Sequence, residues 1–359
     1  MTEVYFKPLA KASRDARRLE VKTGDPSVPS SIFTQPDRYD GEEVTARVVI
    51  LRTRGCRWAL TGGCTFCGYV NDSFVRKIDG AELVAQWENA LQSYAGEPIL
   101  KIYTSGSFFD PYEVPEEAQK AILANMPEGL KKLNVESQAV DITEKRMELV
   151  MSSFPKDRVK LEIGVGLEAA NYEVARYSVN KEFFMEDYRK AAAVAKQHGA
   201  TLKAYTMVKP PFLTEREAIE SAVETAREAG PHSSTISFNP MNIQKNTLVD
   251  KLWKRGQYRP PWLWSVVEIL KRGKQVTDTV VKSDPVAGGK VRGSHNCGKC
   301  DEYVLAAIRD FNVHQNPKVF DRLKCDCKKV WEDVLELEGM FQGPMGRWDD
   351  PMRNSEDDD

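Results

Sequence analysis

The seven cysteines of this 359-residue chain fall into two short groups, and none stands alone. The first group lies near the N-terminus and consists of Cys56, Cys64 and Cys67. The second lies near the C-terminus and consists of Cys297, Cys300, Cys325 and Cys327. In a chain without a targeting signal, clustered cysteines favour metal sites over disulfides. The fold therefore has to bring each group together around a metal.

The first group comes directly after a predicted strand. Residues 48–51 are a short β-branched run, typical of a buried strand, and a glycine-punctuated loop with the three cysteines follows. Folds of the α/β class place their chemistry on such loops. Zinc would need a fourth ligand, and none of the four histidines lies nearby in the sequence. We therefore predict a cubane iron–sulfur cluster on three thiolates, with one iron open to a substrate or cofactor. A structural zinc loop is the alternative.

This loop resembles the hallmark of the radical S-adenosylmethionine (SAM) superfamily, in which an aromatic residue precedes the last of three cysteines. Phe66 occupies that aromatic position. Seven residues separate Cys56 from Cys64, whereas the commonest spacing is three; longer gaps are usual in the branch that resembles the Elongator catalytic subunit. The resemblance implies an α/β fold with a partial (β/α)6 barrel. It also implies that Cys56, Cys64 and Cys67 hold a catalytic 4Fe-4S cluster that binds SAM.

Alternating strands and helices support a barrel. Six strands are predicted, at residues 48–51, 99–103, 133–137, 161–168, 202–209 and 235–239. Amphipathic stretches at 81–91 and 185–196 are predicted helices with one core face. Thr214 and Glu217 predict a capping box at the start of another helix.

The resemblance also implies SAM contacts outside the cysteines. These are Phe66, Ser105, Gly106, Ser107, Glu136, Glu162 and Glu168. Small residues at 105–107 expose backbone N–H and C=O groups, which suits an amino-acid end such as that of methionine. Glu136 ends the third strand, and only one of Glu162 and Glu168 need face the cavity. An ordinary turn and solvent-facing carboxylates are the alternatives.

Polar residues on the later strands suggest a substrate site. Lys203, Tyr205 and Lys209 alternate along the fifth predicted strand and so share one face. Asn239 ends the sixth strand. We predict that these four side chains line a wet cavity that receives the substrate.

The second cysteine group combines a CxxC with a CxC, at Cys297, Cys300, Cys325 and Cys327. Four thiolates close a tetrahedral coordination sphere, so we predict a structural zinc ion. A second iron–sulfur cluster, or a disulfide without metal, is the alternative. His295 is close enough in sequence to replace one thiolate.

The net charge of -2 hides a strong asymmetry. Residues 245–331 carry 18 basic and 9 acidic residues, whereas residues 332–359 carry 2 basic and 10 acidic residues. The basic segment also contains aromatic residues, at Trp253, Tyr258, Trp262 and Trp264. Basic residues among aromatics suit RNA, whose phosphates and unpaired bases they can bind. The alternative is that the tryptophans pack against the barrel.

From about residue 30 to 340, the layout resembles the radical SAM lyases of archaeosine biosynthesis. The resemblance implies a tRNA substrate, archaeosine synthase as partner, and an electron donor. It implies cleavage of the carbon–nitrogen bond of a lysine adduct of 7-cyano-7-deazaguanine at tRNA position 15, which leaves archaeosine. The alternatives are a radical SAM enzyme for another tRNA base or a small molecule, and a non-catalytic zinc and RNA-binding protein.

These patterns divide the chain into four parts. They are an N-terminal extension (1–44), the barrel (45–285), a four-cysteine metal-binding module that contacts tRNA (286–345) and an acidic disordered tail (346–359). No apolar run approaches the roughly 20 residues that span a bilayer, and residues 1–10 lack the apolar core of a signal peptide. We therefore expect a cytoplasmic protein with no membrane contact.

Overall fold

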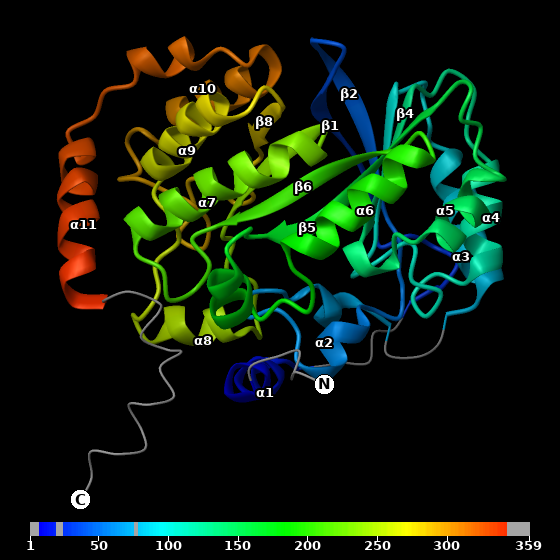
Figure 1. The fold of residues 1–359 in the computed structure, drawn as a ribbon, viewed down its shortest axis with the longest axis horizontal. Helices are drawn as coiled ribbons and strands as arrows, with labels where there is room; N and C mark the ends of the chain where they lie inside the picture. The colour runs from blue at the N-terminus through cyan, green and yellow to red at the C-terminus, as the bar shows by residue number, and fades with distance from the viewer. Residues whose placement is uncertain (1–6, 19–23, 75–77, 343–359) are drawn as a thin grey trace, which may run out of the picture.

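One eight-stranded sheet curls through the molecule, with its strands in chain order from β1 to β8 (Figure 1). This computed structural model describes residues 7–18, 24–74 and 78–342, so the predicted acidic tail lies outside the described residues. Strand β1 pairs antiparallel with β2, and every later neighbour pair is parallel. The strands are β1 (Ser31–Tyr39), β2 (Glu42–Ile50), β3 (Ile99–Tyr103), β4 (Lys132–Ser137), β5 (Lys160–Glu168), β6 (Thr201–Val208), β7 (Thr235–Pro240) and β8 (Val280–Ser283).

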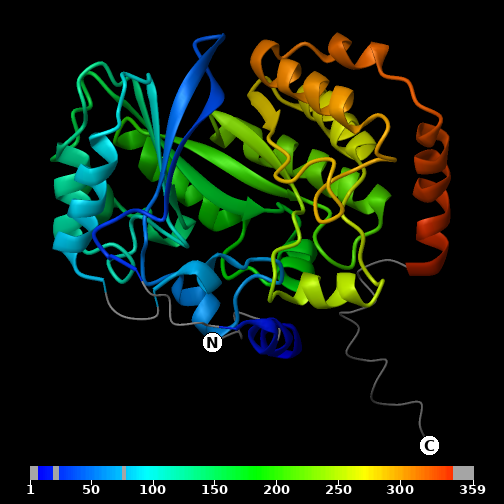
Figure 2. The same ribbon diagram turned by 180° about the vertical axis from the view of Figure 1, so that it is seen from behind.

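Helices connect the parallel strands and cover the convex face of the sheet, which makes the half-barrel of the α/β class (Figures 1 and 2). The crossover helices are α3 (Gly80–Leu91), α4 (Glu116–Ala124), α5 (Glu144–Met151), α6 (Met185–Gln197), α7 (Glu215–Ala229) and α9 (Leu263–Val276). The remaining α-helices are α1 (Lys7–Ala16), α2 (Arg57–Thr61), α8 (Leu248–Lys254), α10 (Asp301–His314) and α11 (Cys327–Gln342).

All six predicted strands are confirmed, and the sheet has two more. Strand β1 joins the sheet through a hairpin whose turn residues, Asp40 and Gly41, both have positive φ (49° and 96°). An Asp-Gly pair suits such a two-residue turn, because both positions need the left-handed region. Strand β8 is only four residues long, which is too short for a pattern of alternation to identify it.

The predicted helix signals are also confirmed. Thr214 accepts a hydrogen bond from the Glu217 backbone N–H, and the Glu217 carboxylate accepts one from the Thr214 backbone N–H at 2.8 Å. Leu83 and Trp87 of α3 are fully buried against the sheet. Apolar burial of this kind, at roughly 25 cal/mol per Å², holds the helices against the barrel.

The two ends of the barrel carry different structures. The cysteine loop follows the carboxyl end of β2, and in Figure 1 it lies at the lower edge of the molecule with α2 and α1. The hairpin tip of β1 and β2 lies at the upper edge, where the amino ends of the parallel strands gather. Among the described residues, no helix has the length and apolar character to cross a bilayer.

Candidate metal centres and barrel interior

Cys56, Cys64 and Cys67 lie on the loop between β2 and α3, and Cys56 is the N-cap of the short helix α2. Arg17, which follows α1, holds this loop from outside the barrel. Its guanidinium donates to the carbonyls of Gly62 and Cys64, the latter at 2.8 Å. A side chain on Gly63 would collide with that guanidinium. Arg17 therefore fixes the turn between the first and second cysteines.

The segment after β5 holds the same loop from the inner side. The Trp58 indole N–H donates to the carbonyl of Asn180 at 2.9 Å, and the Asn180 side chain donates to the carbonyl of Gly63 at 2.8 Å. The Thr65 backbone N–H donates to the Val179 carbonyl at 3.0 Å. The loop is thus tied to two distant parts of the chain, which fixes the positions of its thiols.

The loop after β3 packs directly against the first cysteine. A Cβ placed on Gly106 would lie 2.7 Å from the Cβ of Cys56, so only glycine allows this approach. The buried carboxylate of Glu113 accepts hydrogen bonds from the backbone N–H groups of Ser105 (2.9 Å) and Ser107 (2.6 Å). Those two N–H groups are therefore occupied by Glu113 and are not available to a ligand.

The chemistry of the three thiols fits a cationic cluster. Burial raises the pKa of the Cys64 thiol to about 12 and also raises the pKa values of Cys56 and Cys67. Buried thiolates need positive charge nearby, and a bound metal supplies it. The Gln138 amide donates to the sulfur of Cys56 at 3.3 Å. Lys181 adds a cation: burial alone would lower its pKa, but the nearby Cys64 and Glu168 raise it.

The three loop thiols do not all lie as close together as the ligands of one metal ion must. Within the described ranges, only the C-terminal cysteines form a group of three or more Cys, His, Asp or Glu ligands whose ligand atoms lie within 4.8 Å of one another. One ion needs all its ligands that close, whereas a cubane binds each thiolate through a different iron. As they lie in the structure, the loop thiols therefore do not form a single-ion site.

The predicted SAM residues lie at different depths in the barrel. Glu168, at the end of β5, lies 3.7 Å from the Lys181 ammonium and faces the cysteine loop. Burial raises the pKa of Glu136 to about 7, although Lys203 opposes the shift. Glu162 lies near the amino end of β5, where Ser234 donates to it at 2.9 Å. Of the two glutamates on β5, Glu168 is the one beside the cysteines.

Two further predicted residues, Phe66 and Asn239, lie in different surroundings. Phe66 packs against the small apolar cluster formed by Met241, Ile243 and Val249. The Asn239 side chain accepts a hydrogen bond from Ser237 at 3.1 Å.

Of the three residues predicted to share a face on the fifth strand, only two do. Lys203 and Tyr205 lie on the interior face of β6, with the Lys203 ammonium 4.9 Å from the Tyr205 ring centre. Lys209 follows the strand with a φ of 58°, and its ammonium pairs with Glu215 and Glu338, each at 3.3 Å. Lys209 is thus a structural tie between the barrel and α11.

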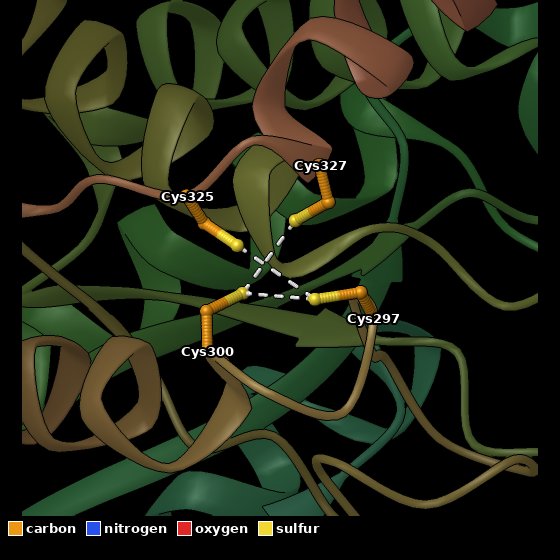
Figure 3. Close-up of side chains that lie close together, drawn as sticks. All are labelled: Cys297, Cys300, Cys325 and Cys327. Atoms are coloured by element: carbon orange, nitrogen blue, oxygen red, sulfur yellow. Dashed lines mark hydrogen bonds between the residues drawn. The ribbon is translucent and has the colours of Figure 1, made fainter.

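The C-terminal cysteines converge on one point (Figure 3). Cys297 and Cys300 come from the loop before α10, Cys325 comes from the loop before α11, and Cys327 is the first residue of α11. Sulfur–sulfur distances are 3.9 Å for Cys297–Cys300, 3.7 Å for Cys297–Cys325 and 3.6 Å for Cys300–Cys327. A tetrahedron with metal–sulfur bonds of about 2.3 Å has edges of about 3.8 Å. These four thiols therefore fit one tetrahedral ion.

Neighbouring side chains orient these four sulfurs. The Asn296 amide donates to Cys300 and the Trp264 indole N–H donates to Cys327, both at 3.3 Å. Gly298 has a φ of 84°, which the tight CxxC turn requires. Although burial opposes it, hydrogen bonding from the backbone N–H of Lys299 lowers the pKa of the Cys297 thiol to about 7. Such hydrogen bonds stabilise the thiolate form that binds a metal.

The prediction that the tryptophans of the basic segment offer stacking surfaces is wrong for two of them. Trp262 and Trp264 are 9% and 3% exposed, because they pack in the main core around α9. The Trp253 ring is covered by the Arg292 guanidinium at 4.5 Å. The alternative, in which these rings pack against the barrel, describes them correctly.

Several residues that shape the first centre carry too little signal in the sequence to be predicted: Arg17, Glu113, Gln138, Asn180 and Lys181. Each is a single polar residue in an irregular segment, and each reaches the cysteine loop from a distant part of the chain. Asn180 carries one local signal, because its φ of 60° is a conformation that asparagine tolerates better than most residues.

A partial barrel with three cysteines on the loop after its first parallel strand has the architecture of the radical SAM class. No protein-family model matches the chain. An archaeosine synthase subunit beta from Methanosarcina acetivorans is 40% identical over 341 residues, which cover 93% of this chain and 98% of that protein. An archaeosine synthase subunit beta from Thermococcus kodakarensis is 34% identical over 328 residues, which cover 88% and 99%. The chain belongs to the family of archaeosine synthase beta subunits.

Among solved structures, an archaeal Elp3 from Methanocaldococcus infernus matches 65% of this chain and 59% of its own. The sequence identity is 16% and the TM-score is 0.45.

Proposed function

We propose that this chain is the radical SAM lyase of archaeosine biosynthesis. It would cleave the carbon–nitrogen bond of the lysine adduct of 7-cyano-7-deazaguanine at tRNA position 15. The observation that carries this proposal is the loop of Cys56, Cys64 and Cys67 at the carboxyl end of β2, in a chain of this family. Among the described residues, only the C-terminal cysteines meet as a single-ion site, which favours different roles for the two cysteine groups.

Cys56, Cys64 and Cys67 would hold a 4Fe-4S cluster, and SAM would occupy its open iron. When bound, the cluster and SAM together would supply a SAM-derived adenosyl group that takes a hydrogen atom from the lysine carbon beside the linking nitrogen. The net change at the adduct is an oxidation followed by hydrolysis. One hydrogen atom would leave to the adenosyl group, one electron and one proton would leave to an electron carrier, and water would supply the oxygen of the aldehyde product. The amidine of archaeosine stays on the base.

The residues of this chain position the reactants and limit access of water. Glu113 fixes the loop after β3, and this loop would hold the methionine end of SAM. Glu136 and Glu168 lie at the carboxyl ends of their strands, where carboxylates suit the ribose hydroxyls and the methionine ammonium. Lys181 balances the charge of the thiolates around Cys64. A closed, pre-arranged site keeps a reactive species from the wrong bond.

The C-terminal cysteines would hold a structural zinc ion, which fits their tetrahedral spacing. The basic segment at 245–331 provides positive charge for the phosphates of tRNA. Family membership favours a complex with the subunit that adds lysine, because the relatives are named as subunits of archaeosine synthase.

The first experiment tests the cluster assignment. Wild type and Cys67→Ala are reconstituted with iron and sulfide without oxygen, reduced with dithionite and given SAM, and 5′-deoxyadenosine is measured. Wild type should produce it, and Cys67→Ala should lose at least a hundredfold in rate with an unchanged circular dichroism spectrum. Ser152→Ala, an exposed substitution on the far end of α5, is the control and should match wild type. A Cys67→Ala protein that cleaves SAM normally would overturn the three-cysteine assignment.

A further inference from the structure

The amino ends of β4 to β8 surround a chamber of about 430 Å³, at the mouth of the barrel opposite the cysteine loop. The lining residues Asp37, Arg38, Tyr39 and Asp40 come from the β1–β2 hairpin, which lies at the upper edge of the molecule in Figure 1. Its lining includes Asp37, Lys132, Glu162, Lys203 and Lys282. Charged side chains of both signs thus face a space of small-molecule size.

Asp37 is an acidic residue of this chamber, and its carboxylate forms ion pairs with two lysines. One of its oxygens lies 2.5 Å from the Lys101 ammonium, and the other lies 3.0 Å from the Lys282 ammonium. Lys282 also pairs with Asp284 at 2.9 Å. Each oxygen of the Asp37 carboxylate is therefore paired with one ammonium, that of Lys101 or of Lys282.

Lys203 is the third lysine of the group and lacks such a partner. Its side chain is 95% buried, since the residue is 5% exposed, and it lines the chamber. Its ammonium makes no hydrogen bond or ion pair within the part of the chain that the structure describes, and its nearest defined contact is the Tyr205 ring at 4.9 Å. Asp37, Glu162 and Glu136 are near enough to interact with this charge, but so are the ammonium groups of Lys101 and Lys282. A buried ammonium beside two other lysines and without a direct ion pair is costly, so this position favours an anionic ligand.

Glu162, the nearest acidic alternative, is committed elsewhere. One of its oxygens accepts from Ser234 at 2.9 Å, and the other lies 3.2 Å from the Asn134 amide and 3.6 Å from the Lys132 ammonium. Within the described residues, no carboxylate therefore makes a direct ion pair with Lys203, whose side chain lines the chamber.

The position of Lys203 connects this chamber to the cysteine side of the barrel. Lys203 precedes Tyr205 by two residues on the same face of β6, a step of about 6.6 Å. The Tyr205 ring packs over Gly164, where a Cβ would approach it within 2.7 Å, and Gly164 pairs in register with Glu136. Gly164 also pairs in register with Lys203, so Lys203 and Glu136 lie in one row across β6, β5 and β4.

We propose that Lys203 binds a carboxylate carried on an aliphatic arm of the substrate. This inference rests on the proposed function, under which the group is the α-carboxylate of the lysine substituent on the tRNA base. A single buried ammonium suits one carboxylate, whereas the phosphates of a nucleic-acid backbone are bound by exposed lysines and arginines.

The test uses Nε-acetyl-L-lysine, which keeps the α-amino-acid end and replaces the base with an acetyl group. Its binding to the reconstituted protein is measured by calorimetry for wild type, Lys203→Met and Lys196→Met, where Lys196 is an exposed lysine of α6. We expect Lys203→Met to weaken binding at least tenfold and Lys196→Met to leave it unchanged. N-acetylcadaverine, which lacks the carboxylate, should bind at least tenfold more weakly than the amino acid.

Thermal unfolding provides an independent readout. Lys203→Met removes an unpaired buried charge, so its midpoint without ligand should rise above that of wild type. Equal affinity of wild type and Lys203→Met would overturn the proposal, as would an absence of binding to wild type or Lys203-dependent binding of inorganic phosphate alone. Lys203-dependent binding of the probe, together with no cleavage of lysine-modified tRNA, would support the carboxylate site while refuting the proposed function.

Discussion

Gly106 lies against Cys56 so closely that a methyl group on its Cα would be 2.7 Å from the Cβ of the cysteine. The same methyl group would lie 2.7 Å from a carboxylate oxygen of Glu113. The loop after β3 and the first cysteine therefore share one tightly packed contact, and the carboxylate of Glu113 fixes that loop from behind. The position of the Cys56 thiol therefore depends on the absence of a side chain at Gly106, in the loop after the neighbouring strand.

Gly106→Ala should therefore displace Cys56 and impair cluster assembly. We expect at least a tenfold loss of bound iron after reconstitution, and a loss of about 1–3 kcal/mol in unfolding free energy from overpacking. Iron and sulfide per chain, and chemical denaturation, measure the two effects. Gly339→Ala is the matched control, because no atom lies within 4 Å of its added methyl group and its site is helical; it should be neutral or slightly stabilising. Full cluster content in Gly106→Ala would contradict this packing argument.

Asp37→Asn should be among the most destabilising polar substitutions in the chain. It leaves the buried ammonium of Lys101 without its carboxylate partner and weakens the pairing of Lys282. Breaking a buried ion pair from one side costs about 3–5 kcal/mol. Urea denaturation monitored by circular dichroism measures the change.

Asp15→Asn is the control for that comparison. Asp15 pairs with Lys11 at 2.5 Å on the surface of α1, where both side chains are largely exposed. Surface pairs contribute at most about 1 kcal/mol. Equal effects of the two substitutions would show that the chamber charges are not buried as described.

Binding of the carboxylate probe should depend on pH through Lys203. Burial, with Lys282 and Lys101 beside it, lowers the pKa of Lys203 to about 8, while Asp37 and Glu162 oppose the shift. Only the protonated amine attracts a carboxylate, so affinity is complete below this pKa and falls above it. We expect binding at pH 9 to be about tenfold weaker than at pH 7, because one unit above the pKa leaves about a tenth of the amine protonated.

Lys203→Arg separates this effect from general alkaline effects. A guanidinium stays charged throughout this range, so that variant should bind the probe with the same affinity at pH 7 and pH 9. The same tenfold loss in Lys203→Arg would assign the titration to another group.

Removing the C-terminal metal should unfold its surroundings before the barrel. Cys300 is fully buried between α9 and α10, and its thiol is one of four that meet at the centre. Cys300→Ser should lose the bound ion and, with it, stabilisation on the order of several kcal/mol in this segment. Limited proteolysis should then cut between residues 297 and 342 first, and zinc per chain should fall from one to none. A variant with normal zinc content and normal protease resistance would contradict the assignment.

The periodic parts of the fold could be predicted from the sequence. Strands such as 99–103 and 235–239 are short apolar runs between turn residues, and Thr214 and Glu217 form a local signal that depends on no other segment. The β1 hairpin carried a usable signal in its Asp40-Gly41 turn, but its strand lacks a clear apolar alternation. Strand β8 has too few residues to carry any signal.

The residues around the first centre could not be predicted, because their roles arise from contacts between distant segments. Arg17 reaches Cys64 across 47 positions, and Asn180 reaches Gly63 across 117. Alternation along the sequence predicts that Lys203 and Lys209 share one face of a strand, and the same limit explains why this prediction fails. The left-handed backbone at Lys209 ends the strand and turns that side chain toward Glu215.

The central claim is that this chain converts a lysine-modified base in tRNA into archaeosine. The most direct measurement incubates the anaerobically reconstituted protein with SAM, dithionite and tRNA that carries the lysine adduct at position 15. The tRNA is then digested and its nucleosides are identified by mass spectrometry. We predict the loss of the adduct and the formation of archaeosine in proportion to 5′-deoxyadenosine, with neither in Cys67→Ala. An unchanged adduct alongside active SAM cleavage would contradict the claim and assign the enzyme to another substrate.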